Sequence, residues 1–232
     1  MKYLTTERFS ILFQAIGLAC LLGYSGFTAN RDYQMKALAD TTGAKETAFE
    51  LKIKMRNLWD DNATWSRTVL LCRINQLPGT EESMKRLLLN QIAIGNAFKP
   101  FYGVEAGRKL TLLLNKHILI AEEVVTAAKT KDSVKMKEIN TRWYRNADEI
   151  SAFLSTRNPD WSFADIKQML TKQISCTTDQ VEQRIKQNYK ADIIAYDKVH
   201  DEMLKMSVIL SDGIVKQFPE KFKVQVAETV SK

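Results

Sequence analysis

The stretch LLNKHILIA, residues 113–121, decides the fold, because it places one histidine on an apolar helical stripe. Two other stretches follow the same order, LWDDN at residues 58–62 and MLTKQ at residues 169–173. In each, two bulky apolar residues and two polar residues precede a polar side chain at the fifth position. The residues at the fifth position are Asn62, His117 and Gln173. The offsets of 55 (117 − 62) and 56 (173 − 117) indicate a repeated unit.

A second set of polar residues follows the first at a nearly constant distance of 28, 29 and 29 residues (90 − 62, 146 − 117, 202 − 173). This second set is Asn90, Asn146 and Glu202. A proline follows it in every unit, although the chain has only four prolines. A helical hairpin of about 55 residues cannot bury its apolar stripe alone, so such units pack on one another. The sequence predicts three repeated hairpins, at about residues 44–103, 104–160 and 161–219.

Composition favours long helices. The chain has 232 residues, of which 45% are hydrophobic, and only nine glycines and four prolines. This length is sufficient to bury a core in one domain. We find no apolar–polar alternation typical of strands and predict an all-α fold, a six-helix bundle over residues 44–219. The predicted helices span about residues 44–74, 80–99, 107–129, 133–155, 162–187 and 189–218.

The formal net charge of +7 raises the question of an acidic partner. Acidic residues are interleaved with the basic ones in nearly every predicted helix, and no basic run contains interspersed aromatic residues. We therefore expect a solvated basic surface rather than nucleic-acid binding. The three cysteines are far apart and provide no disulfide framework.

The N-terminal residues 1–30 resemble a signal peptide or signal anchor. Residues 9–30 contain no charged side chain, and Lys2 and Arg8 precede them. Twenty-two such residues are long enough to span a bilayer, and the preceding positive charges favour a cytoplasmic N-terminus. We favour an anchor or an inefficiently cleaved signal, so that residues 9–30 contact the membrane and the bulk of the chain is exported. Cleavage would make the protein secreted, and a third possibility is a buried helix of a cytosolic protein. Residues 31–43 are a predicted linker and residues 220–232 a polar tail.

The first set of polar residues, Asn62, His117 and Gln173, lies among apolar neighbours at i±3 and i±4, so we expect it inside the core. If the hairpins pack around one axis, these side chains meet there and satisfy one another. The alternative is a small polar pocket for a ligand or a metal. The second set has charged or polar neighbours on its own face and is expected to be less buried.

A metal site is the weaker hypothesis for this sequence. Asn and Gln are poor ligands for transition metals. His200 follows Asp197 by three residues, but a di-metal carboxylate bundle needs two such motifs and two further carboxylates. The candidates for a single divalent metal are His117, Asp197 and His200, with Asp192 nearby. The chain contains no P-loop, GxGxxG, HExxH or GxSxG motif, which gives catalysis few candidates.

Several segments resemble a family of small, uncharacterised, all-helical bacterial proteins over about residues 50–220. The segments are LWDDNATWSR (58–67), NQIAIGNAFKPFYG (90–103), HILIA (117–121), WYRNADEI (143–150) and DGIVKQFP (212–219). Some relatives carry labels such as glycosyltransferase or acetylglutamate kinase, which no motif in this chain supports. The resemblance implies histidines where this chain has Asn62, Gln173 and Glu202, and therefore a metal or cofactor site in the family type. This chain keeps only His117 of that set.

Two hypotheses for function follow. The first is an exported, membrane-tethered helical bundle that binds a protein or small-molecule partner, without catalysis and without a cofactor. The second is a degenerate metal- or cofactor-binding bundle related to a metal-dependent enzyme, in which His117 would face Asp192, Asp197 or Glu202.

Overall fold

The computed structural model describes residues 46–222, which form six α-helices and one 3-10 turn. The elements are α2 (Ala48–Asn75), α3 (Thr80–Tyr102), α4 (Val104–Thr130), α5 (Ser133–Ser155), α6 (Phe163–Ile185), α7 (Tyr189–Gln217) and η1 (Pro219–Lys221). The prediction of an all-α bundle of six helices is confirmed for this part of the chain.

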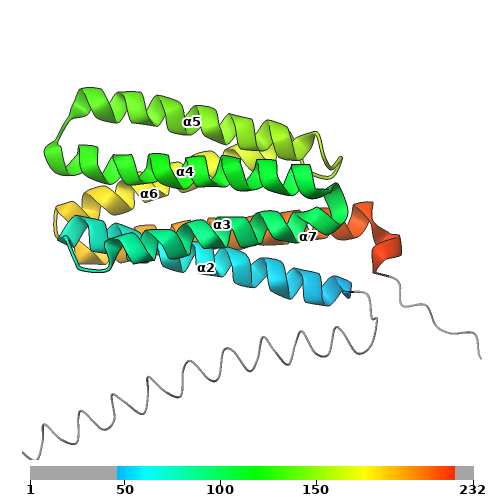
Figure 1. Cartoon of the computed structure of the whole chain (residues 1–232). Coiled ribbons are helices and arrows are strands. Elements are labelled where there is room, and N and C mark those ends of the chain that lie inside the picture. The colour runs from blue at the N-terminus through cyan, green and yellow to red at the C-terminus, as the bar shows by residue number, and fades with distance from the viewer. Residues whose placement is uncertain (1–45, 223–232) are drawn as a thin grey trace, which may run out of the picture. The chain divides into compact units, whose positions relative to one another are not determined.

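The helices run alternately up and down, and each packs against the next one in the chain (Figure 1). Helix α7 also packs against α2, which closes the ring. Helices α2, α4 and α6 contact one another as well, so these three parallel helices surround the axis of the bundle. The α2–α3, α4–α5 and α6–α7 connections therefore lie at the same end of the molecule (Figure 1).

Short polar signals in the sequence set several helix ends. At the start of α2, Thr47 and Glu50 form a reciprocal capping box. Ser162 accepts a hydrogen bond from the backbone N–H of Asp165 and begins α6, as its spacing in the sequence predicts. Asn188 caps α7 in the same way.

The predicted boundary between the second and third helices is wrong. Helix α3 continues through Pro100 to Tyr102, and α4 begins at Val104 rather than near residue 107. A proline in the last turn removes only one backbone donor. Contacts of two aromatic side chains, Phe101 and Tyr102, stabilise the extra turn. Phe101 packs on Phe218 with ring centroids 5.8 Å apart, and Tyr102 lies 5.4 Å from the ring of Trp161. Gly103, with φ 86°, then reverses the chain within one residue.

Two facing glycines allow α3 and α4 to approach closely. A Cβ atom on Gly95 would lie 2.5 Å from the backbone oxygen of Gly107, and one on Gly107 would lie 2.5 Å from the oxygen of Gly95. The side-chain hydroxyl of Thr111 fills the remaining space and donates to the Gly107 oxygen at 3.1 Å. This contact fixes the position of α4, which carries His117.

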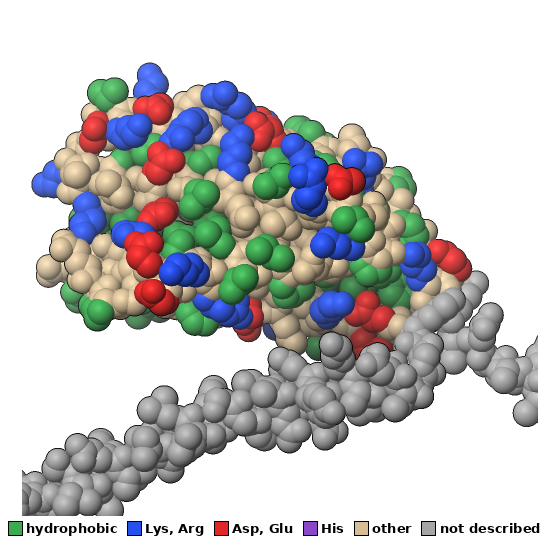
Figure 2. Space-filling model, in the orientation of Figure 1, with side chains coloured by type: hydrophobic (Ala, Val, Ile, Leu, Met, Phe, Trp, Pro, Cys, Tyr) green, Lys and Arg blue, Asp and Glu red, His purple; other side chains and the backbone are tan. Residues whose placement is uncertain are grey.

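The surface of the described part carries charges of both signs. On the face shown in Figure 2, lysines and arginines alternate with acidic and apolar side chains. Across residues 46–222, no helix has both the length and the apolar character that a membrane crossing requires. The predicted anchor at residues 9–30 and the linker at residues 31–43 lie outside the described residues, as does nearly all of the tail.

Candidate functional site

His117 lies at the centre of the bundle, with 4% of its surface exposed. Its Nδ1 is 2.8 Å from Oδ1 of Asn146, whose amide nitrogen in turn donates to the backbone oxygen of Leu113 at 3.2 Å. Its Nε2 accepts a hydrogen bond of 3.0 Å from the indole nitrogen of Trp143. Because an indole N–H only donates, the proton of the imidazole is on Nδ1 and the lone pair is on Nε2.

Gln173 of α6 approaches the same nitrogen. Its side-chain Oε1 lies 3.2 Å from Nε2 of His117, which already accepts a hydrogen bond from Trp143. Burial lowers the pKa of His117 to about 4, against the opposing effect of the hydrogen bonds with Asn146 and Gln173. The imidazole is therefore neutral at pH 7.

The predicted meeting of the first set of polar residues is observed for one pair. His117 and Gln173 contact each other, whereas Asn62 takes its partners elsewhere. The amide nitrogen of Asn62 donates to Gln91 of α3 at 3.3 Å, and its oxygen accepts from Ser66 at 3.2 Å. A polar residue on an apolar stripe indicates burial, but it does not say which neighbouring helix supplies the partner.

The prediction that the second set is less buried is wrong. Asn90, Asn146 and Glu202 are 2%, 0% and 5% exposed, whereas Gln173 of the first set is only partly buried. Each member lies between helices, where its hydrogen-bonding capacity is used. Asn90 donates to the backbone oxygen of Leu58 at 2.9 Å, and Glu202 accepts from Lys172 at 2.7 Å and Lys205 at 2.9 Å. Of the polar neighbours on the same helix face that suggested exposure, Lys205 is a partner of Glu202.

The candidate metal ligands do not gather in the described part of the chain. His200 contacts Asp60 of α2 at 2.6 Å, and Asp197 is exposed on α7. The Nε2 lone pair of His117 already accepts from Trp143. Within residues 46–222, no three His, Cys, Asp or Glu side chains form a group that could hold a metal ion. The metal hypothesis stays a prediction.

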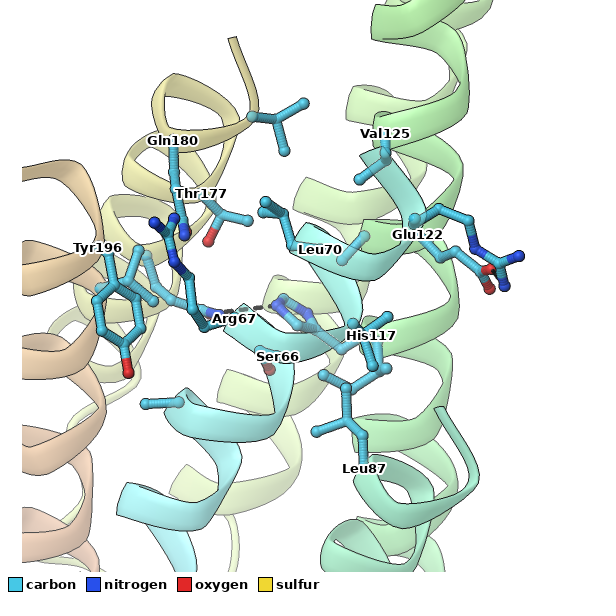
Figure 3. Close-up of a pocket in the computed structure, with 18 of the residues that line it drawn as sticks. Ser66, Arg67, Leu70, Leu87, His117, Glu122, Val125, Thr177, Gln180 and Tyr196 are labelled. Atoms are coloured by element: carbon cyan, nitrogen blue, oxygen red, sulfur yellow. Dashed lines mark hydrogen bonds and ion pairs between the residues drawn. The ribbon is translucent and has the colours of Figure 1, made fainter. Parts of the chain in front are cut away.

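An axial cavity of about 50 Å³ lies beside His117, on the side toward the C-terminal ends of α2, α4 and α6 (Figure 3). Leu70, Leu87 and Val125 form part of its apolar wall. Its polar lining includes Ser66, Arg67, His117, Gln173, Thr177 and Gln180, and residues with further polar atoms are Arg73, Glu122, Trp143 and Tyr196. The ion pair between Arg73 and Glu122 bridges α2 and α4 at the wall of the cavity.

Three side-chain polar atoms of residues that line the cavity have no hydrogen-bond partner within residues 46–222. They are Nε2 of Gln180, whose side chain is 2% exposed, Oγ1 of Thr177 and Nε of Arg73. A buried polar group left unsatisfied costs about 1–3 kcal/mol. The cavity therefore has hydrogen-bonding capacity that the described protein atoms do not use.

Thr177 and Gln180 were not among the predicted site residues, although their spacing in the sequence is a signal. Gln173, Thr177 and Gln180 are spaced i, i+4 and i+7, so they line one stripe of α6. At the corresponding positions of α4, one offset of 56 earlier, the chain has Ala121 and Val124. On α2 the corresponding residues are Ser66 and Val69, so only α6 is polar at both positions.

A buried ionic cluster lies next to the cavity and contributes Arg67 and Tyr196 to its lining. Asp192 is fully buried and accepts two hydrogen bonds from Arg67, of which the one to Nη2 measures 2.7 Å. Arg184 approaches the same carboxylate at 3.4 Å. Tyr196 lies against the Arg67 guanidinium, with the ring centroid 5.2 Å from Cζ. Three helices, α2, α6 and α7, meet at this cluster.

The fold and the site define an all-helical bundle with a small, partly polar cavity on its axis. No protein-family model, curated protein or solved structure matches the chain. The family resemblance and the function that it implies therefore stay expectations.

Proposed function

We propose that this protein is a helical-bundle binding protein that holds a small ligand in its axial cavity and has no catalysis of its own. The observation that carries the proposal is the amide of Gln180, which is buried at the cavity and lacks a partner within residues 46–222. Buried polar groups in proteins almost always have partners, and an exception calls for a ligand, an ion or ordered water.

The polar groups at the cavity suit binding better than proton transfer. Thr177 and Gln180 are neutral donors and acceptors at any ordinary pH. His117, the one imidazole at the cavity wall, is neutral at pH 7 and engaged at both ring nitrogens. An apolar cavity with a few directed polar groups is the usual form of a small-molecule site.

The proposal is tested with xenon as a probe of the cavity. We expect xenon to shift the methyl NMR signals of Leu70, Leu87 and Val125 in the full chain held in detergent micelles, because dry apolar cavities take up xenon. Ala121→Leu fills the cavity and should abolish these shifts. Ala152→Leu, the same change at an exposed site, should leave them unchanged. Xenon that shifts none of the three methyl signals in the unmodified chain would contradict a ligand-accessible cavity.

We also propose that the bundle is exported and tethered to the membrane through residues 9–30, which are uncharged and follow two basic side chains. We expect the full chain to remain in the membrane pellet after a carbonate wash. Leu18→Arg places a charge near the middle of the segment and should move the protein to the soluble fraction. Release of the unmodified chain by carbonate would rule out a retained anchor.

Finally, we propose that the three hairpins are internal repeats. A hydrogen bond at corresponding positions supports this interpretation for the first two hairpins. Asn90 donates to the backbone oxygen of Leu58, and Asn146, which is 56 residues later, donates to that of Leu113, which is 55 residues later. The third hairpin has Glu202 at this position, with lysine partners instead.

A further inference from the structure

We infer that the axial cavity selects a carboxylate on a short apolar stem, the size of acetate or propionate. The inference rests on the proposed binding function and names the chemistry of its ligand. The cavity has a volume of about 50 Å³, and one water molecule needs about 10–15 Å³ of such volume. The cavity therefore has room for roughly three to five heavy atoms. Acetate has four and propionate has five.

The unpartnered polar atoms at the cavity can all donate a hydrogen bond. Nε2 of Gln180 and the hydroxyl of Thr177 have no partner within residues 46–222, and the guanidinium of Arg67 lines the cavity beside them. Figure 3 shows these three side chains on the same side of the cavity, near α6. A carboxylate has two oxygens and about four lone pairs, so one such group has enough acceptors for the two unpartnered donors of α6.

The charge near this wall favours an anion over a neutral acceptor. Two arginines, Arg67 and Arg184, share the single carboxylate of Asp192, which leaves one positive charge in excess. The other acidic group that lines the cavity, Glu122, is paired with Arg73. Arg73 also lies 3.1 Å from the carboxylate of Glu81, whose charge is screened because that side chain is 67% exposed. An unbalanced charge acts strongly at a site from which water is largely excluded.

The helix dipoles disfavour an anion in the cavity, because the cavity lies toward the partly negative C-terminal ends of three parallel helices. Basic residues offset this effect at each end. Arg73 lies in the last turn of α2 and Arg184 in that of α6. Lys129, in the last turn of α4, donates to the backbone oxygens of Arg73 and Ile74 at 3.3 and 3.1 Å.

The rest of the cavity selects the stem. Leu70, Leu87 and Val125 offer only apolar contacts. The carboxylate that binds can belong to a free short-chain acid or form the end of a longer molecule. The test below separates them.

The experiment compares propionate with propionamide, which has the same number of heavy atoms but no charge. Binding to the full chain in micelles is followed by the methyl NMR signals of Leu70 and Val125. We expect propionate to bind at least tenfold more tightly than propionamide. Equal affinity for the two compounds would overturn the inference, and if xenon still shifts these signals the proposed binding function survives.

Two variants test the donors. Gln180→Leu keeps the approximate volume and removes the amide, so we expect at least a tenfold loss of propionate affinity while the xenon shifts remain. The matched control is Gln168→Leu, on the exposed face of the same helix, which should bind propionate normally. Unchanged propionate affinity in Gln180→Leu would also overturn the inference.

Octanoate distinguishes the two sources. If octanoate displaces propionate from the cavity, the cavity takes the carboxylate end of a longer acid. If propionate binds and octanoate does not compete, the ligand is a free short-chain acid.

Discussion

Replacement of Asp192 by alanine should lower the free energy of unfolding by about 3–5 kcal/mol. The carboxylate is fully buried, and it accepts hydrogen bonds from Arg67 and Arg184, which are themselves largely buried. The substitution leaves two cations without their partner in a poorly solvated site. Because α2, α6 and α7 meet at this carboxylate, we expect a loss of cooperativity as well as of stability.

Urea unfolding followed by circular dichroism measures the effect. Asp197→Ala, the same change five residues along α7 at an exposed position, is the control and should cost little. The double variant Arg67→Met with Asp192→Ala should recover part of the loss, because it removes one unpaired cation. A loss below about 1 kcal/mol in Asp192→Ala would mean that water solvates the cluster, contrary to its burial.

Stability should also fall between pH 6.5 and pH 4 because of His117. Burial lowers the pKa of this imidazole from 6.5 to about 4. Between these two pH values the imidazole is protonated in the unfolded chain and neutral in the folded bundle, which favours unfolding. The contribution is complete above pH 6.5 and declines as the pH falls to 4. The shift of 2.5 (6.5 − 4), at about 1.4 kcal/mol for each unit, corresponds to roughly 3 kcal/mol.

The measurement is the free energy of unfolding in urea at pH 7, 6 and 5, where most carboxylates remain ionised. About 2 kcal/mol of the loss should be present at pH 5. His117→Gln should remove this dependence. The chain has only one other histidine, and His200→Gln should leave the dependence in place. A pH dependence that follows His200 instead of His117 would refute the assignment of a neutral, buried imidazole.

How much of the bundle is predictable from sequence depends on the range of the interactions. Helical periodicity, the polar cap at Ser162 and the sparse prolines are local signals, and they were sufficient for six helices in their order. The end of α3 was not predictable, because the turn beyond Pro100 is held by aromatic contacts with residues more than fifty positions away. Local propensity opposes that turn, and packing decides it.

The candidate site divides in the same way. That His117 is buried follows from its apolar neighbours at i±3 and i±4, which are set by the chain alone. Its partners Trp143 and Asn146 depend on how α5 is rotated against α4. No pattern in the sequence pairs Arg67 with Asp192 across 125 residues.

The sequence by itself therefore determined which segments are helical and that polar residues enter their apolar stripes. The tertiary structure decided which polar groups meet, which remain without a partner at the cavity and how buried the second set is. The physical reason is that a helix stripe follows from local periodicity, whereas a hydrogen-bond partner follows from the rotation and depth at which two helices pack. Gln180 shows the difference, because its place on α6 is visible in the sequence and its lack of a partner is visible only in the packed bundle.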